Sequence, residues 1–126
     1  RKLFSALPAS SLLDLSSASA ATLESYRQEG LSEISKGKVA VVLLAGGQGT
    51  RLGSSDPKGM YDIGLPSKRS IFQILVDRVM RVQMIAHRSD SQLKPENQKC
   101  KILIMTSAQN HLETVSYFRS MKFFGY

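Results

Sequence analysis

Two short apolar runs predict the strands of a parallel sheet. Residues 39–45 read VAVVLLA and residues 101–106 read KILIMT, both rich in β-branched and long aliphatic side chains. The first run is continuous rather than alternating, a pattern typical of a strand buried on both faces in a parallel sheet. We therefore expect both strands to be buried, with Met105 among the core residues.

A helix is predicted between the two strands, because apolar residues recur there at three- and four-residue spacing. Its apolar face, within residues 72–87, consists of Phe72, Leu75, Val76, Val79, Val82 and Ala86. Asp77 and Arg81 fall on the polar face at the spacing of a weak ion pair. Met80 is interpreted as a core residue.

A second helix is predicted after the second strand. Asn110 followed by Glu113 is typical of a helix N-terminus, and the helix should run through about Arg119. The order strand, helix, strand, helix (βαβα) predicts an α/β fold with a parallel sheet and a right-handed crossover. In such sheets ligands bind outside the carboxyl ends of the strands, and residues 46–53 follow such an end.

The N-terminal part is predicted to be a separate element. Residues 1–36 form a helical arm in this interpretation, and residues 37–126 form the body of the α/β domain. Thr22 is expected to cap a short helix in the arm, and Gly30 is expected to end it.

Composition narrows the function classes. The chain has 126 residues, enough for one domain, and a formal charge of +7 from 17 basic and 10 acidic residues. The basic residues are scattered and not interleaved with aromatic residues, which argues against nucleic-acid binding and favours a phosphate-bearing small molecule. Cys100 is the single cysteine, so an internal disulfide is excluded and a reducing, cytoplasmic location is expected.

Membrane and export signals are weak. No apolar run approaches the length of a membrane span. Residues 1–20 combine a basic start with many serines, which suits a short surface helix and leaves an organelle transit peptide open. Pro8 and Asp14 interrupt the apolar stretch and argue against a secretory signal.

The segment after the first strand has the composition of a phosphate-binding loop. Glycines let the backbone approach a ligand and direct its N–H groups at an anion, and Arg51 and Lys58 add positive charge. A P-loop is excluded, because no Gly-Lys-Ser/Thr sequence occurs. The dinucleotide fingerprint fits poorly, because the glycine spacing is one residue too long and Pro57 interrupts the helix that should follow.

A third template fits at every position. Residues 44–53 read LAGGQGTRLG and residues 56–67 read DPKGMYDIGLPS, and both strongly resemble the UDP-N-acetylhexosamine pyrophosphorylases. Gln48 and the sequence Pro-Lys-Gly-Met favour this family over the glucose-1-phosphate uridylyltransferases. The resemblance covers roughly residues 22–126 and implies a Rossmann-like nucleotidyltransferase fold, of which residues 37–126 would be the N-terminal part.

The resemblance implies a reaction. UTP and N-acetylglucosamine 1-phosphate would give UDP-N-acetylglucosamine and pyrophosphate, with Mg²⁺. Arg51 would hold the departing pyrophosphate and Lys58 would neutralise charge on the phosphates, which makes these two the expected catalytic residues. The expected UTP-binding set is Leu44, Ala45, Gly46, Gly47, Gly49, Thr50, Arg51 and Lys58.

No residue is assigned to the metal. Asp56 and Asp62 are interpreted as loop-forming residues, so Mg²⁺ would be bound mainly through the nucleotide and residues absent from this chain.

Members of that family are several times longer than 126 residues. We therefore expect a piece of the enzyme that carries the triphosphate half of the site and is inactive alone. The alternative is a non-catalytic binding or interaction module of the same fold, and the sugar, a glucosamine or galactosamine derivative, stays open. A two-stranded piece of a larger sheet would expose an edge and apolar faces.

Overall fold

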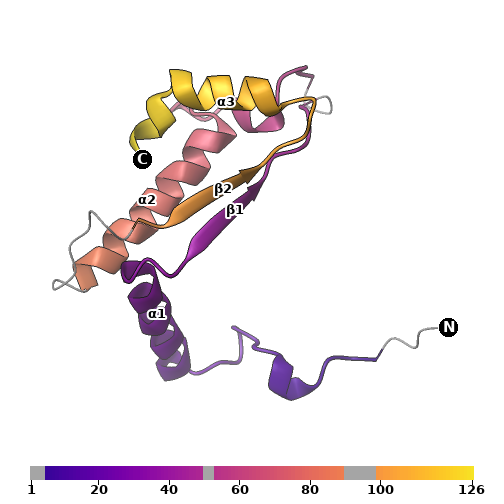
Figure 1. Ribbon diagram of the computed structural model, residues 1–126. Coiled ribbons are helices and arrows are strands. Elements are labelled where there is room, and N and C mark those ends of the chain that lie inside the picture. Colours follow the sequence, from indigo (N-terminus) through magenta and orange to yellow (C-terminus); the bar gives the residue numbers. More distant parts are fainter. Residues whose placement is uncertain (1–4, 50–52, 90–98) are drawn as a thin grey trace. The chain divides into compact units, whose positions relative to one another are not determined.

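The computed structural model describes residues 5–49, 53–89 and 99–126 (Figure 1). The chain divides into two compact units, residues 1–30 and 31–126, and the division falls within helix α1 (Ala20–Ser35). The first unit also contains the short 3₁₀ helix η1 (Ala9–Ser11).

Helix α1 is longer than the sequence predicted. The side-chain oxygen of Ser19, rather than that of Thr22, caps it by accepting the backbone N–H of Thr22 at 3.1 Å. The helix continues through Gly30 and ends before Gly37, whose φ of 69° lies in the left-handed region. The N–H groups of Gly37 and Lys38 donate to carbonyls of the last turn, as in a Schellman motif. The predicted stop at Gly30 was therefore wrong, because the left-handed residue that ends the helix comes seven positions later.

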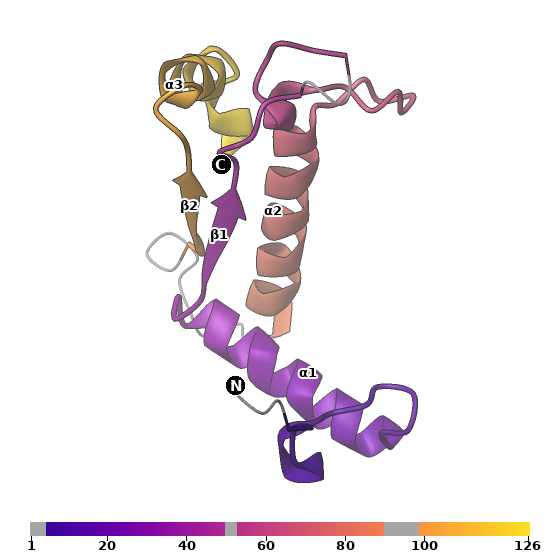
Figure 2. The same cartoon turned by 90° about the vertical axis from the view of Figure 1, so that its right-hand side faces the viewer.

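The second unit contains a two-stranded parallel sheet. Strand β1 (Ala40–Leu44) pairs with β2 (Lys101–Met105) in a register that runs from Ala40 opposite Lys101 to Leu44 opposite Met105. Helix α2 (Ile71–Ser89) connects the strands and α3 (His111–Ser120) follows the second. The predicted order of strand, helix, strand and helix is confirmed (Figures 1 and 2).

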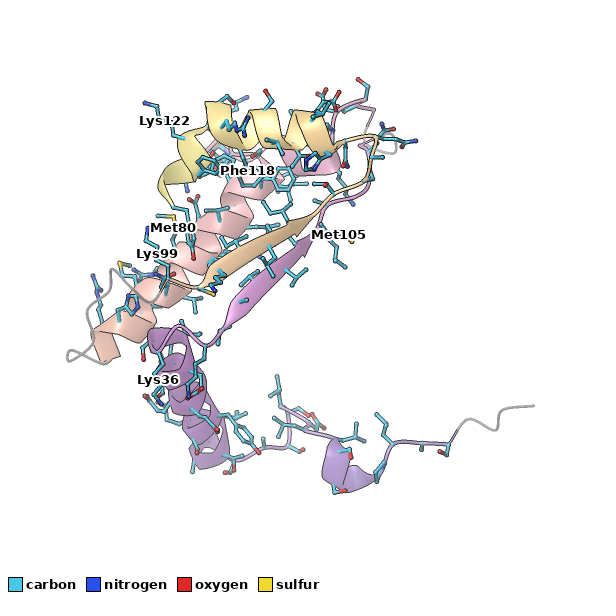
Figure 3. All side chains as sticks on the ribbon, viewed as in Figure 1. Lys36, Met80, Lys99, Met105, Phe118 and Lys122 are labelled. Atoms are coloured by element: carbon cyan, nitrogen blue, oxygen red, sulfur yellow. The ribbon has the colours of Figure 1, made fainter. Side chains whose placement is uncertain are left out.

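The core lies on one face of this sheet. Phe72, Val76 and Phe118 are buried at its centre, and side chains of both strands and of the C-terminal segment pack around them. The rings of Phe72 and Phe118 meet edge to face with centroids 4.9 Å apart, which joins α2 to α3. In Figure 3, Phe118 lies between α3 and the sheet, whereas Met105 lies on the other face.

The other face of the sheet is exposed. Burial alternates along both strands, and the outward side chains are Val42, Leu44, Leu103 and Met105, each at least half exposed. The prediction of strands buried on both faces was wrong for this chain, because the packed helices α2 and α3 cover a single face. The expected exposure of apolar sheet surface is confirmed.

Other details of α2 also differ from the sequence prediction. Val82 and Met80, both expected in the core, are 44% and 36% exposed. Asp77 pairs with Arg69, 2.6 Å away across the helix start, rather than with Arg81 on its own helix. Periodicity placed the apolar face correctly at Phe72, Val76 and Ala86, but it could not tell how far the covering layer extends.

The chain ends in a left-handed turn, η5 (Lys122–Gly125). Lys122, Phe123 and Phe124 have φ of 49°, 51° and 56°. Such a conformation costs roughly 1–2 kcal/mol per residue for side chains other than glycine. The ring of Phe124 packs edge to face on Phe118, 5.2 Å between centroids, and this burial offsets part of that cost.

Candidate functional site

A cavity of about 480 Å³ lies beside the carboxyl end of β1 and the first turns of α2. Its lining consists of Val42, Leu43, Leu44, Ala45, Gly47, Lys58, Gly59, Ile71, Phe72 and Leu75. Four of the residues predicted to bind UTP are therefore brought together here: Leu44, Ala45, Gly47 and Lys58. This is the edge of a parallel sheet at which α/β proteins bind their ligands.

A second cavity, of about 460 Å³, lies near the other end of α2. Its lining includes Met80, His87, Lys99 and Tyr126, and none of the predicted site residues. Size does not distinguish the two cavities. We assign the functional site to the first because of the residues that converge on it.

The loop after β1 folds back on itself. The N–H of Gly49 donates to the carbonyl of Asp56 at 2.9 Å, and the N–H of Lys58 donates to the carbonyl of Gly47 at 3.2 Å. These bonds form an isolated antiparallel bridge between Gln48 and Pro57. Lys58, eleven residues along the chain from Gly47, thereby lies beside the glycine cluster.

The glycines of the loop have different surroundings. A Cβ on Gly49 would lie 3.2 Å from the carbonyl oxygen of Asp56, and a Cβ on Gly46 would lie 3.4 Å from the Met105 methyl group. A Cβ on Gly47 would meet nothing within 4 Å. A side chain at Gly49 would therefore crowd the loop itself, whereas Gly47 lines the cavity and has open space at its Cβ position.

Lys58 begins the short 3₁₀ helix η3 (Lys58–Met60), which follows the buried residue Pro57. The Lys58 side chain is exposed and makes no ion pair with a residue in the described ranges. The next residue, Gly59, lies flat against the ring of Phe72, so close that a Cβ would come within 2.2 Å of a ring carbon. This contact holds η3, and with it Lys58, against α2.

Helix α2 starts at the wall of the cavity. The hydroxyl of Ser70 accepts the N–H of Gln73 at 3.2 Å, and Ile71 lines the cavity. The partial positive charge of a helix N-terminus adds to that of Lys58. The described part of the cavity thus combines an apolar wall with positive potential, as a nucleotide requires.

Two predicted residues, Thr50 and Arg51, lie outside the described residues. Asp56 and Asp62, which the sequence predicted to be loop-forming residues, make hydrogen bonds within the loop. Asp62 accepts the N–H of Gly64 at 2.9 Å, and Asp56 accepts the hydroxyl of Ser54 at 3.3 Å. Within residues 5–49, 53–89 and 99–126, no cluster of three or more His, Cys, Asp or Glu side chains could hold a metal ion.

Sequence interpretation missed the role of Asn110. The residue occupies the N-cap position of α3, as predicted, but its side chain makes no capping hydrogen bond. It is fully buried, and its carboxamide connects the segment after β2 to the segment after β1. The only signal in the sequence was its position, five residues after the strand, and a capping role explains that position equally well.

Among the residues that the structure describes, the groups with shifted pKa values do not line the cavity beside β1. Burial raises the pKa of the Cys100 thiol. Burial and, to a lesser degree, the neighbouring Cys100 raise the pKa of Tyr126. Among the helices that the structure describes, none has the length and hydropathy needed to cross a membrane.

The chain matches the family described as UTP--glucose-1-phosphate uridylyltransferase over residues 5–125. It is 50% identical over 103 residues to UDP-N-acetylglucosamine diphosphorylase 2 of Arabidopsis thaliana, and 48% identical over 100 residues to the UDP-N-acetylglucosamine pyrophosphorylase of Saccharomyces cerevisiae. These alignments cover 81% and 79% of the chain but 20% of each relative. The chain therefore spans about one fifth of the length of these curated relatives.

Two solved structures are also similar to the chain over most of its length. The UDP-N-acetylglucosamine pyrophosphorylase of Trypanosoma brucei, solved with an inhibitor, is 32% identical with a TM-score of 0.70, over 86% of this chain and 22% of that one. A structure from Entamoeba histolytica is also 32% identical, with a TM-score of 0.77 over 90% of this chain and 28% of that one. The predicted α/β nucleotidyltransferase fold is confirmed.

Proposed function

The chain belongs to the UTP--glucose-1-phosphate uridylyltransferase family, and on that premise we propose that it binds the triphosphate of UTP in a UDP-N-acetylglucosamine-forming enzyme. The observation that carries the proposal is the convergence of Leu44, Ala45, Gly47 and Lys58 on one cavity at the carboxyl end of β1. The backbone of the glycine cluster would contact the nucleotide, and Lys58 would neutralise charge on its phosphates. Thr50 and Arg51 complete the proposed set, with Arg51 holding the pyrophosphate.

The proposed reaction is a displacement at phosphorus. An oxygen of N-acetylglucosamine 1-phosphate, or of its galactosamine analogue, forms a bond to the α-phosphorus of UTP. The bond from that phosphorus to the oxygen shared with the β-phosphate breaks, and pyrophosphate leaves. Positioning of the phosphates and stabilisation of their charge account for most of the catalysis in such a step.

Bound Mg²⁺ would supply further positive charge to the phosphates. Asp56 and Asp62 each accept a hydrogen bond within the loop, and we assign neither to the ion. We therefore propose that the ion binds mainly through the nucleotide and through residues that this chain does not contain. The single cysteine fits the cytoplasmic location that we also propose.

Because the chain spans one fifth of the length of these relatives, we propose that it binds UTP but does not turn it over alone. A non-catalytic interaction module is the second candidate function, and the exposed apolar face of the sheet favours it. The two candidates differ in nucleotide binding. The interaction module binds UTP weakly or not at all, whereas the proposed site binds it measurably.

Calorimetric titration of the chain with UTP and Mg²⁺ tests the proposal. Lys58→Ala should weaken binding about tenfold or more, because it removes a charged partner of the phosphates. Lys101→Ala is the matched control, since it removes the same charge from an exposed lysine at the far end of the sheet. Equal affinity of the Lys58 and Lys101 variants would exclude the assigned role of Lys58. Release of pyrophosphate from UTP and the sugar phosphate by the parent chain would exclude its inactivity.

A further inference from the structure

The side chain of Asn110 takes the place of a hydrogen bond in the β1–β2 ladder. The last direct bond of the ladder runs from the N–H of Ala45 to the carbonyl of Met105, at 2.9 Å. In a parallel ladder the next bond would run from the N–H of Ser107 back to the carbonyl of Ala45. Instead, Ser107 donates to Asn110 Oδ1 at 2.9 Å, and Asn110 Nδ2 donates to the carbonyl of Ala45 at 2.8 Å.

The Asn110 carboxamide accepts one hydrogen bond and donates another, as a backbone peptide group does in a ladder. Asn110 is fully buried, and both its oxygen and its nitrogen have partners. A longer contact of 3.5 Å joins Nδ2 to the carbonyl of Gly47. The two strands therefore continue past their last direct bond with an amide group between them, and they separate at their carboxyl ends, where the cavity lies.

The insertion also determines which way the loop N–H groups point. The carbonyl of Ala45 accepts from Asn110 at 2.8 Å, and the carbonyl of Gly47 accepts the N–H of Lys58 at 3.2 Å in addition to its longer contact of 3.5 Å with Asn110. In a planar trans peptide the C=O and N–H point in opposite directions, so the N–H groups of Gly46 and Gln48 point away from Asn110. The N–H groups of Gly46, Gly47 and Gln48 donate no hydrogen bond within the part of the chain that the structure describes.

We infer that Asn110 is a positioning residue that turns the N–H groups of the glycine loop toward the nucleotide phosphates. This role rests on the proposed function, since it presumes that the loop binds an anion. Asn110 acts mainly through the carbonyl of Ala45, with a longer contact to that of Gly47, and is not itself a catalytic residue. Backbone N–H groups that are fixed before the ligand arrives bind an anion without loss of loop entropy.

Asn110→Asp is the variant that tests this role most directly. It keeps the size of the side chain and an acceptor for Ser107, and it removes the N–H donor to Ala45. Ser35→Ala is the matched control: Ser35 is fully buried in the same unit, and its hydroxyl donates to the carbonyl of Ser32 at 2.8 Å, away from the cavity. Both variants thus lose one buried side-chain donor to a backbone carbonyl.

The measurements are UTP affinity and backbone order from ¹⁵N NMR. Asn110→Asp should weaken UTP binding about tenfold and lower the order parameters of Gly46, Gly47 and Gln48, while Ser35→Ala changes neither. If the Asp variant does not fold, titration of the labelled parent chain still decides the role. UTP should shift the amides of Gly46 and Gln48 most, and the Asn110 side-chain amide should stay hydrogen-bonded.

Two results would overturn the inference. One is unchanged loop order in Asn110→Asp, and the other is the absence of shifts at Gly46 and Gln48 when UTP binds the parent chain. Failure of the parent chain to bind UTP refutes the proposed function instead. In that case the order parameters alone decide whether Asn110 fixes the loop.

Discussion

Substituting alanine for Gly59 should destabilise the second unit, because no space for a methyl group exists there. A Cβ at this position would lie 2.2, 2.3 and 2.4 Å from three ring carbons of Phe72. Ordinary contacts between carbon atoms are about 3.5–4.0 Å, so the ring or η3 must move by more than an ångström. Phe72 is 1% exposed and its ring packs on Phe118, so the movement would disturb the centre of the core.

Overpacking of this kind costs about 1–3 kcal/mol. For a unit of this size, that loss corresponds to a fall of roughly 4–8 °C in melting temperature for each kcal/mol. UTP affinity should fall as well, because η3 carries Lys58 to the cavity. Thermal and urea denaturation followed by circular dichroism measure the first effect, and calorimetry measures the second.

A second substitution separates steric conflict from other effects of the methyl group. Phe72→Leu shortens the side chain, so the double variant Gly59→Ala, Phe72→Leu should lose less stability than the sum of the two single losses. An additive double variant, or a Gly59→Ala chain as stable as the parent, would show that Gly59 and the Phe72 ring are not in close contact.

Gly30→Ala should raise the stability of α1 by about 0.5–1 kcal/mol, read from helix content during thermal melting, because Gly30 lies inside a helix with nothing within 4 Å of its Cβ position. Thr114→Val should raise the urea midpoint, because the buried Thr114 hydroxyl has no hydrogen-bond partner in the described segments and valine removes its desolvation penalty; a lower midpoint would contradict this. Stability should fall as pH rises above the ordinary Cys100 pKa of 9.0, because burial raises that pKa and the unfolded thiol loses its proton first; Cys100→Ser, compared by urea denaturation at about pH 8 and pH 10, should weaken this dependence. Leu103→Lys should reduce self-association in light scattering and leave UTP binding unchanged, because Leu103 is 55% exposed on the open sheet face and does not line the cavity.

Much of the fold could be predicted because its elements carry strong local signals. The apolar runs gave both strands to within one residue at each end, and three- and four-residue periodicity gave α2. The helix ends were less predictable. Gly30 and Gly37 are both plausible stops, and only the backbone conformation distinguishes them.

The residues of the candidate site were predictable where residue type and spacing along the chain together indicate phosphate binding. Residues 44–58 carry glycines and cations in an order that resembles the UDP-N-acetylhexosamine pyrophosphorylases, and the structure brings Leu44, Ala45, Gly47 and Lys58 to one cavity. The contacts that hold them were not predictable. Gly59 enters the sequence analysis only as part of Pro-Lys-Gly-Met, and Asn110 reads as a helix cap. Their actual partners are Phe72 and Ala45, which are 13 and 65 residues away.

The sequence by itself thus determined the order of the elements, the composition of the loop and the charge available to it, since these depend on neighbouring residues. Tertiary structure decided which sheet face is covered and which way the loop N–H groups point. Each of these depends on contacts between residues far apart in the chain. The phosphate loop is recognisable in the sequence because its composition depends on neighbouring residues. Its orientation by Asn110 is visible only in the fold, because Asn110 lies far from the loop along the chain.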